Sequence, residues 1–487
     1  MTRLRALDQL PAHVARPGFD RDAHGVGMVH LGVGAFHKAH QAVYTDAALS
    51  AAGGDWRILG VNLRSTTAAD QLGPQNGLFT VVERGANGDR ARVIGAIERA
   101  CTLGPDRAAV MAALVAPTTR IVSLTVSEKG YGLDRSGGGV DPAHPAIAAD
   151  LVRPEEPVGV AGLLVRALVL RDAAGVAPFA VLSCDNLPEN GAMVRALLTD
   201  FAARTAPQHV DFIANQVAFP STMVDRITPA STADTLARTE QLLGCRDEAA
   251  VETEPFSQWV IEDRFPGGRP AWDAGGAIFT DDARPFEAMK LGMLNGTHSL
   301  MAYAGFLCGH RYVRDVMADH ALAALVRRHM SAAAATLKPP TGLILAQYAA
   351  DLAKRFANPA IAHETYQIAM DGSQKMPQRI FAPALQAMER GAPVDSFAFV
   401  TAAWLRYCLG RDDAGEPYKL RDPLEGEWAG TAADPTALFE RGAQLPGVMP
   451  DALARDDAWR QAVIARLVVM VRDGMARAVH TQLQGAF

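Results

Sequence analysis

Three residues whose side chains can move a proton or hold an oxygen atom lie close together in an apolar stretch, RPFEAMKLGMLNGTHSLMAYA, at residues 284–304. If this stretch forms one α-helix, a rotation of about 100° per residue places His298 about 80° and Asn295 about 140° from Lys290. All three side chains then open on one side of the helix. An amine, an amide and an imidazole in an apolar setting can transfer a proton to or from a hydroxyl group. An amphipathic helix with a snorkelling lysine and packed polar residues would give a similar pattern.

A second amide follows the apolar run FAVLSCDNLPENG, which we interpret as a buried strand that ends in polar groups. In open α/β sheets ligands bind beyond the carboxyl ends of the strands, so Asn186 stands where a site would form. The amides of Asn186 and Asn295 can donate to a developing oxyanion, an effect worth on the order of 3 kcal/mol per donor. Lys290 can take the hydroxyl proton if partial desolvation lowers its pKa toward neutrality. We interpret the neighbouring Asp185 and Asn190 as turn residues of the strand end.

Metal ligands are sparse in the sequence. His37 and His40 in FHKAH have a spacing that can hold a metal, but no third ligand is evident, so packing and a hydrogen bond near a cofactor are favoured. The cysteines are dispersed without CxxC or CxxH spacing, which argues against a disulfide framework and a structural zinc site. We therefore expect a metal-independent protein with five unpaired cysteines, namely Cys101, Cys184, Cys245, Cys308 and Cys408.

Residues 26–33, VGMVHLGV, form an apolar run that ends in glycines, and AFHKAHQAVYTDAAL after it has helical periodicity. Strand, glycine turn and helix form the geometry of a dinucleotide site, in which the backbone approaches a pyrophosphate at the helix N-terminus. The match to GxGxxG is incomplete, because His37 stands at the third glycine position. The residues expected to contact the cofactor here are Gly32, Val33, Gly34, Ala35 and Phe36.

The run WRILGVNL at residues 56–63 predicts the second strand of a βαβ unit. An acidic residue near the end of this strand often binds the ribose hydroxyls of NAD, whereas a basic one can hold the 2′-phosphate of NADP. Here the strand is followed by Arg64, which we expect to contact the cofactor, and the first acid is Asp70. The sequence therefore leaves the choice between NAD and NADP open.

A chain of 487 residues is too long for one core, so two domains are expected. LFTVVERG, ARVIGAIERA and RIVSLTVSEKGY predict further strands, a helix is expected at roughly 158–174, and residues 211–282 have the pattern of short strands and loops. From about residue 284 helical windows dominate. The predicted fold is therefore α/β, with a Rossmann-type domain carrying extra strands at 1–283 and a mainly helical domain at 284–487. The helical windows of the second domain are 313–335, 341–357, 395–409 and 459–481.

The overall composition is that of an ordinary globular protein, with 49% hydrophobic and 21% charged residues. A net charge of −6 without a long basic run gives no sign of a nucleic-acid partner or an anionic membrane. The N-terminus lacks the apolar segment of a secretory signal, and no apolar run reaches the length of a membrane span. We expect a cytoplasmic protein with a small-molecule ligand. The oligomeric state is not indicated.

A second polar group lies in MDGSQKMPQRI at residues 370–380. Lys375 and Arg379 would suit a carboxylate or a polyhydroxyl end of a substrate. The other interpretation is a solvated pair of surface cations, unless this segment folds against the junction of the two domains.

The ordered motifs HLGVGAFHKAHQAVY, SLTVSEKGY, SCDNLPENG, FPSTMVDRITP, EPFSQWVIEDRF, KLGMLNGTHS and DGSQKMPQR resemble those of one family, across about residues 28 to 424. This is the polyol-specific long-chain dehydrogenase/reductase family, which includes mannitol 2-dehydrogenase and fructuronate reductase. The resemblance implies a metal-independent oxidoreductase that uses NAD by family habit. It also implies that Lys290 is the general acid/base and that Asn186 and Asn295 bind the oxyanion. By the same resemblance His298, Asp225 and Lys375 contact substrate.

One position bears on the substrate. Polyol-oxidising members resemble one another in having an arginine where this chain has Gln367, whereas fructuronate reductases look more like this chain, with QIAMDGSQK followed by PQR. The resemblance therefore favours reversible reduction of D-fructuronate to D-mannonate, with Arg379 and Lys375 receiving the carboxylate. The alternative is a mannitol or arabinitol dehydrogenase that acts on a neutral polyol.

Two further departures from the family pattern are Gly292, where KLRxLNG has arginine, and Lys38, where FHRAH has arginine. Either can alter local packing or cofactor contacts. An alternative from another class is a dinucleotide-binding regulatory or scaffold protein that has lost catalysis, but the intact Lys290, Asn295, His298 and Asn186 argue against it.

Overall fold

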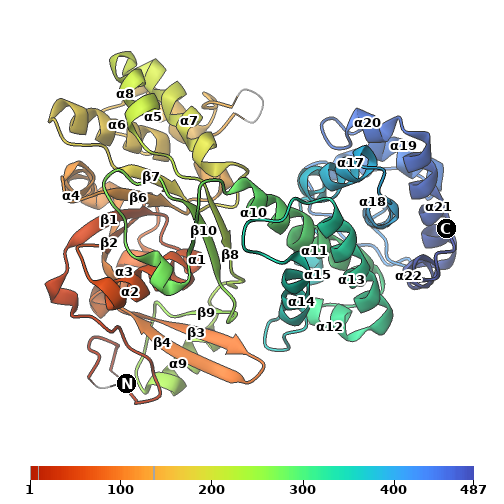
Figure 1. The fold of residues 1–487 in the computed structure, drawn as a ribbon, viewed down its shortest axis with the longest axis horizontal. Helices are drawn as coiled ribbons and strands as arrows, with labels where there is room; N and C mark the ends of the chain where they lie inside the picture. The colour runs from red at the N-terminus through yellow and green to blue at the C-terminus, as the bar shows by residue number, and fades with distance from the viewer. Residues whose placement is uncertain (1, 9, 135–137) are drawn as a thin grey trace. The chain divides into compact units, whose positions relative to one another are not determined.

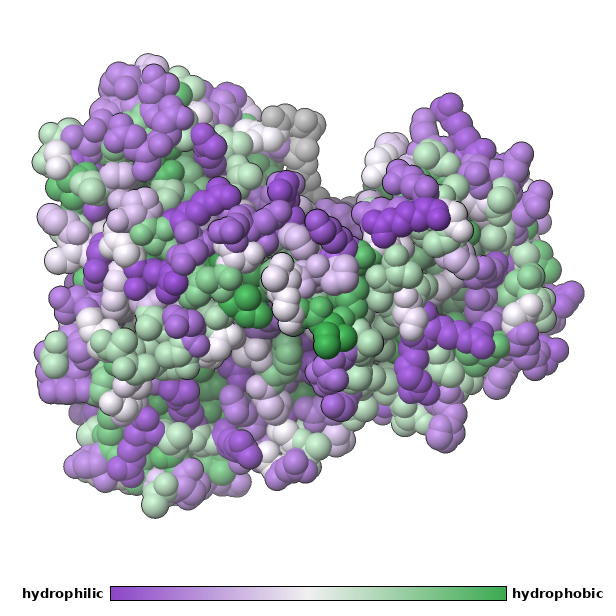
Figure 2. Space-filling view, in the orientation of Figure 1, coloured by the Kyte–Doolittle hydropathy of each residue, from purple (hydrophilic) through white to green (hydrophobic). Residues whose placement is uncertain are grey.

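The computed structural model describes residues 2–8, 10–134 and 138–487 (Figure 1). Its contacts divide the chain into two compact units, Met1–Arg284 and Pro285–Phe487. In the described residues every strand belongs to the first unit, and the second unit is built from helices and loops. Figure 2 shows polar side chains spread over much of the visible face of each unit, with smaller apolar areas between them.

The first unit is built on a parallel five-stranded sheet with the order β5-β2-β1-β6-β7. β6 and β7 are buried along their whole length, as expected for strands of a parallel sheet that is covered on its faces. The strand order reverses between β1 and β6, which is where open α/β sheets bind ligands at their carboxyl ends. This sheet confirms the predicted Rossmann-type domain. Its strands are β1 Val26–Leu31, β2 Arg57–Asn62, β5 Ile97–Thr102, β6 Ile121–Leu124 and β7 Ala180–Ser183.

Helices connect these strands, and Figure 1 shows α5 to α8 grouped beside β6 and β7. The long helix predicted after Gly34 is interrupted, because His40 adopts φ −123° and ψ −90° and separates α1 from α2. The ring of His40 is held by tertiary contacts, since its Nε2 lies 2.9 Å from the Gln258 carbonyl oxygen. The helices are α1 Ala35–Ala39, α2 Gln41–Ala52, α3 Thr67–Leu72, α4 Leu103–Val115, α5 Pro145–Val152, α6 Val160–Ala173, α7 Asn190–Thr205 and α8 Val210–Gln216.

Two three-stranded sheets supply the extra strands that were predicted, with the orders β11-β10-β8 and β4-β3-β9. ARVIGAIERA, predicted as one strand, is divided between β4 and β5, which belong to different sheets. The single-strand prediction was wrong because the turn at Gly95 and Ala96 lies within an unbroken apolar pattern. The strands are β3 Phe79–Gly85, β4 Gly88–Ile94, β8 Thr222–Asp225, β9 Val251–Thr253, β10 Gln258–Glu262 and β11 Ile278–Thr280.

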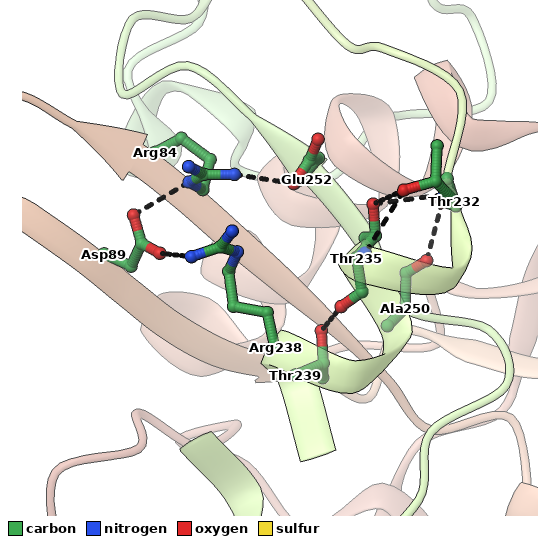
Figure 3. Close-up of polar contacts among 9 residues, drawn as sticks. Arg84, Asp89, Thr232, Thr235, Arg238, Thr239, Ala250 and Glu252 are labelled. Carbon is green, nitrogen blue, oxygen red and sulfur yellow. Dashed lines mark hydrogen bonds and ion pairs between the residues drawn. The ribbon is translucent and has the colours of Figure 1, made fainter. Parts of the chain in front are cut away.

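The stretch predicted as short strands and loops also contains a helix, α9 Ala233–Leu243, so that prediction was incomplete. α9 begins with a capping box, in which Thr232 accepts from the Thr235 amide and the Thr235 hydroxyl accepts from the Thr232 amide. Figure 3 shows how ion pairs join α9 to the three-stranded sheet β4-β3-β9. Asp89 binds Arg84 at 2.9 Å and Arg238 at 3.4 Å.

The second unit confirms the predicted helical domain, with breaks at cap residues inside two predicted windows. Asp319 separates α12 from α13 and accepts from the amides of Ala321 and Leu322. Gly474, at φ 85°, separates α21 from α22. The helices after the lysine stretch are α12 Val313–Ala318, α13 His320–Ala335, α14 Leu345–Phe356, α15 Thr365–Ile368, α16 Gly372–Met376, η8 Pro377–Phe381, α17 Ala382–Glu389, α18 Asp395–Tyr407, α19 Pro435–Gln444, α20 Asp451–Ala454, α21 Asp457–Asp473 and α22 Met475–Gln484.

The lysine stretch itself is not one regular α-helix. α-Helical and π-helical segments alternate in the order α10 Arg284–Met289, η6 Lys290–Asn295, α11 Gly296–Leu300 and η7 Met301–Gly305. The prediction of a uniform rotation of about 100° per residue was therefore wrong, because a π-helical turn bonds each amide one residue further back than an α-helical turn does. π-Helical turns inside α-helices occur frequently at functional sites.

α18 forms the centre of the second unit. Residues 397–407 of this helix are buried all round, so its apolar side chains, among them Phe397 and Trp404, pack on every face.

In the part of the chain that the structure describes, no helix combines the length and the apolar character needed to span a membrane.

Candidate active site

The first unit holds a cavity of about 540 Å³ at the carboxyl ends of β1, β2 and β6. Of the residues predicted to contact a cofactor, Gly32, Val33, Gly34 and Arg64 line it, whereas Ala35 and Phe36 begin α1 and do not. The lining also includes Asn62, Leu63, Ser65, Thr125, Val126, Ser127, Lys129, Gly130, His144, Ala146, Val158 and Gly159.

The glycine turn after β1 fits the close approach of a pyrophosphate. Gly32 has φ 99°, and a Cβ there would lie 2.1 Å from the Thr125 carbonyl oxygen, so this position needs glycine. A Cβ on Gly34 would meet only the Gly32 carbonyl oxygen, at 4.0 Å, so the space beside it is open. These residues fit a dinucleotide in the cavity. His37, at the third glycine position, instead packs inward, its ring stacked 3.4 Å from that of His30.

The loop after β6 is fixed by Asp185. This carboxylate accepts from the amides of Val126 and Ser127, at 3.0 and 3.1 Å, and from the Tyr131 hydroxyl at 2.7 Å. Burial raises the pKa of Asp185. Asp185 thus acts as the turn residue that was predicted, and Asn186 follows it in an exposed position.

Asn190 is the first residue of α7, so the prediction that it lies in a turn was wrong. Its amide nitrogen donates to the Thr222 carbonyl oxygen at 3.0 Å, and its side-chain oxygen accepts from the Thr222 amide at 2.9 Å. These bonds tie the start of α7 to β8. Asp225 is buried at the end of β8, opposite Gln258 in the register of that sheet.

The second unit holds Lys290, Asn295 and His298. They are buried, with 8%, 6% and 6% of their surface exposed. Lys290 begins η6, Asn295 ends it, and His298 lies in α11. In the described residues neither the Asn295 Nδ2 nor the His298 Nε2 has a hydrogen-bond partner. Buried polar atoms are nearly always paired, so these two atoms on adjoining turns could bind a ligand.

Gly296 explains how a second segment approaches this helix. A Cβ at Gly296 would lie 2.9 Å from the Arg379 carbonyl oxygen, so glycine allows η8 to pack directly on the start of α11. Arg379 Nη1 then lies 3.5 Å from the Asn295 carbonyl oxygen. The segment at 370–380 is therefore packed beside Asn295, and the surface-cation interpretation of Lys375 and Arg379 was wrong.

These two cations are half-buried. Lys375 donates from Nζ to the Ile368 carbonyl oxygen at 3.2 Å and to that of Met370. Burial and the nearby Arg379 lower the pKa of Lys375 to about 8. Burial also lowers the pKa of Arg379 to about 10. Within the described part of the chain no carboxylate forms an ion pair with Arg379, whereas the charges of Asp371 and Asp422 act on the neighbouring Lys375.

His298 lies within the same group of cations. Burial holds the pKa of His298 well below its usual value, and the electrostatic effects of His363, Arg379, Arg355 and Lys375 lower it further. Its ring centroid is 5.2 Å from that of His363, in an edge-to-face arrangement. Burial, followed by the charge of Lys375, lowers the pKa of His363 to about 4. Both imidazoles are therefore neutral near pH 7.

His363 was missed by sequence reasoning, as was Phe356, whose ring centroid lies 4.9 Å from that of His298. The only signal in the sequence was that His363 lies four positions before Gln367 in the substrate motif. Gln367 itself is exposed on α15.

The two departures from the family pattern have local structural settings. Lys38 donates from Nζ to the Ala249 carbonyl oxygen at 2.7 Å, and burial lowers its pKa to about 8. Lys38 therefore holds two segments of the first unit together through its bond to the Ala249 carbonyl. A Cβ on Gly292 would make ordinary contacts, at 3.9 Å with Pro383 and 4.0 Å with Ala333.

Two family descriptions match the sequence in order along the chain. Residues 26–274 match the mannitol dehydrogenase Rossmann domain, and residues 282–438 match the mannitol dehydrogenase C-terminal domain.

Relatives of known name match over most of their length. The chain is 42% identical over 466 residues to the uncharacterized oxidoreductase YeiQ of Escherichia coli (strain K12), which covers 93% of this chain and 96% of that protein. It is 42% identical over 420 residues to the D-mannonate oxidoreductase of the same organism, and this match covers 85% of this chain and 86% of that protein.

A solved structure is similar over the whole chain. The ternary complex of Pseudomonas fluorescens mannitol 2-dehydrogenase with NAD and D-mannitol has a TM-score of 0.87 at 37% identity, covering 99% of this chain and 100% of that one. The chain therefore belongs to the mannitol dehydrogenase family, a family of NAD-dependent oxidoreductases that act on polyols and sugar acids.

Proposed function

We propose that the protein reversibly reduces D-fructuronate to D-mannonate with NAD(H) as its cofactor. The observation that carries the proposal is the cationic group of the second unit, in which half-buried Arg379 has no carboxylate partner among the described residues. A cation that is partly removed from water without an anion is costly, and a substrate carboxylate would supply the missing charge.

Arg379 and Lys375 would bind the carboxylate in this proposal. A guanidinium can hold both carboxylate oxygens at once, while an ammonium acts as a point charge, so the two side chains are complementary. His298 and His363 are neutral imidazoles beside them and can donate a hydrogen bond without adding charge. A neutral polyol would leave Arg379 without a counter-charge.

Lys290 would be the general acid/base. In reduction, its ammonium gives a proton to the oxygen of the substrate ketone, and in oxidation the amine takes that proton back from the hydroxyl. The amides of Asn295 and Asn186 would each donate a hydrogen bond to the oxygen as negative charge develops on it. The unpartnered Nδ2 of Asn295 supports this role. NADH supplies the hydride when it is bound.

The dinucleotide would lie in the cavity of the first unit, against Gly32 and Gly34. The support for this placement is the open space beside Gly34 and the position of the cavity at the carboxyl ends of β1, β2 and β6.

A neutral polyol such as D-mannitol is the second candidate substrate. It is favoured by the structural similarity to a mannitol 2-dehydrogenase over the whole chain. The exposed Gln367, where polyol-oxidising members have arginine, favours the uronate instead.

The variant Arg379→Ala tests the proposal. We expect the KM for D-fructuronate to rise at least about tenfold, because the carboxylate loses a charged partner, while kcat changes less. Steady-state kinetics with NADH give both constants. Arg327→Ala is the matched control, since Arg327 is an exposed arginine of α13. An unchanged KM in Arg379→Ala would show that this guanidinium does not bind the carboxylate.

A further inference from the structure

The cofactor cavity has an end formed by the residues that follow β2, namely Asn62, Leu63, Arg64 and Ser65. In Rossmann-type domains the residue after the second strand meets the adenosine ribose, where NAD carries a free 2′-hydroxyl and NADP carries a 2′-phosphate. The side chains at this end therefore decide which of the two cofactors can bind.

No acidic side chain is available to bind the ribose hydroxyls or to repel a phosphate. None of the described residues that line the cavity is Asp or Glu. The polar residue at the end of β2 is Asn62, whose side-chain oxygen accepts from the Val33 amide at 2.7 Å. Asp70, the first acid after the strand, accepts from the Thr66 hydroxyl at 2.7 Å and does not line the cavity.

The charged groups that line the cavity are cationic. Arg64 and Lys129 both line it, and Arg64 stands at the ribose end. Arg64 is exposed, and in the described part of the chain its guanidinium has no hydrogen-bond or ion-pair partner. A guanidinium in this state can bind a phosphate through two parallel hydrogen bonds.

Hydroxyl groups stand next to Arg64. Ser65 also lines the cavity, and its Oγ lies 2.8 Å from the Thr67 Oγ1 and 3.2 Å from the Thr67 amide. These contacts form a short turn that holds the Ser65 side chain in place. The Ser65 hydroxyl is exposed, so it can turn its one hydrogen from Thr67 Oγ1 to a phosphate that Arg64 holds by charge.

We propose that Arg64 and Ser65 form a 2′-phosphate subsite, so that the protein binds NADP(H) as well as NAD(H). This inference concerns the adenosine end of the cofactor alone. It is independent of the substrate named above, because no residue of the cationic group in the second unit takes part in it.

The test compares two ligands that lack nicotinamide. Isothermal titration calorimetry of the full chain with 2′,5′-ADP and with 5′-AMP isolates the 2′-phosphate, which adds a charge of about −2. We expect 2′,5′-ADP to bind at least as tightly as 5′-AMP, and its affinity to fall more steeply with added salt. Weaker binding of 2′,5′-ADP than of 5′-AMP would overturn the proposal.

The variant Arg64→Ser assigns the effect to one side chain. We expect it to weaken 2′,5′-ADP binding at least tenfold more than it weakens 5′-AMP binding, while Arg64→Lys loses less. Equal losses for the two ligands would overturn the proposal. Arg195→Ser is the matched control, because Arg195 is an exposed arginine of α7 that does not line this cavity.

Binding of the complete cofactors gives a readout that is separate from turnover. Quenching of protein fluorescence by NADPH and NADH should give dissociation constants within about tenfold of each other in the native chain. Arg64→Ser should raise the constant for NADPH at least tenfold more than that for NADH. NADPH binding more than a hundredfold weaker than NADH binding in the native chain would exclude a functional subsite, and thermal melting of each variant checks that it folds.

Discussion

At the scale of single residues, the candidate site of the second unit contains buried polar atoms that have no hydrogen-bond partner among the described residues. Asn295 Nδ2 and His298 Nε2 have no partner among the described residues, and Arg379 has no carboxylate. An unpaired buried polar group costs roughly 1–3 kcal/mol, so a ligand that pairs with Asn295 Nδ2 and His298 Nε2 would remove that cost.

Lys290 provides the most direct residue-scale prediction. We expect Lys290→Ala to lower kcat by about 10² to 10⁴, because the ketone oxygen loses its proton donor. The dissociation constant of NADH, measured by fluorescence, should change less than about twofold. Lys354→Ala is the control, since Lys354 is an exposed lysine of α14. Near-normal turnover in Lys290→Ala would refute the assignment of the general acid/base.

Residue types and spacing alone predict Lys290, Asn295 and His298 as candidate site residues, because acid–base side chains in an apolar stretch are conspicuous. The resemblance to the polyol-specific dehydrogenase/reductase family is confirmed by the two matching family descriptions. His363 could not be found in this way. It is a candidate only because its ring lies against that of His298, 65 residues earlier in the chain.

At the scale of elements, the packing of η8 on α11 depends on a glycine. We expect Gly296→Ala to lower the melting temperature and raise the KM for the uronate, because its Cβ would lie 2.9 Å from the Arg379 carbonyl oxygen. The backbone must then move by some tenths of an ångström, and Arg379 moves with it. Overpacking of this kind typically costs about 1–3 kcal/mol.

Gly292→Ala is the matched control for this prediction, because its Cβ would make contacts no closer than 3.9 Å. It should keep or slightly raise the melting temperature, since replacing a helical glycine reduces the entropy of the unfolded chain. Scanning calorimetry and steady-state kinetics compare the two variants. Similar behaviour of both would contradict the close packing of η8 on α11.

Sequence patterns predicted which segments are strands and helices more reliably than where the elements break. A period of 3.6 residues carries no signal for a π-helical turn, so the change at Lys290–Asn295 was missed. The break at His40 was missed because a bond from its ring to the Gln258 carbonyl, over 200 residues away, competes with the local pattern. α9 was missed because its start is marked by a capping box, which an apolar pattern does not reveal.

At the scale of the whole molecule, buried histidines couple stability to pH. Burial lowers the pKa of His363 and His329 from 6.5 to about 4 and that of His37 from 6.5 to about 3. In the unfolded chain these groups take up protons at higher pH than in the folded chain. Stability is therefore fully present above about pH 6.5 and is lost as the pH falls toward 4, because the unfolded state binds more protons in that range.

We expect the melting temperature to fall steadily between pH 6.5 and pH 4, as scanning calorimetry measures. His329→Gln should flatten this dependence, since its ring is buried with Nε2 unpartnered in the described residues. One pKa unit corresponds to about 1.4 kcal/mol for each group. His320→Gln, at an exposed position, is the control and should leave the slope unchanged. A melting temperature that does not depend on pH in this range would contradict the burial of neutral histidines.

The most direct test of the account is the substrate preference of the purified protein. NADH oxidation is followed with D-fructuronate and, separately, with D-fructose at matched concentrations. We expect a kcat/KM at least about a hundredfold higher for fructuronate, a difference of roughly 2.7 kcal/mol in transition-state binding, because only the uronate carries a carboxylate that can pair with Arg379. An equal or higher kcat/KM for fructose would contradict it and identify the protein as a dehydrogenase of neutral polyols.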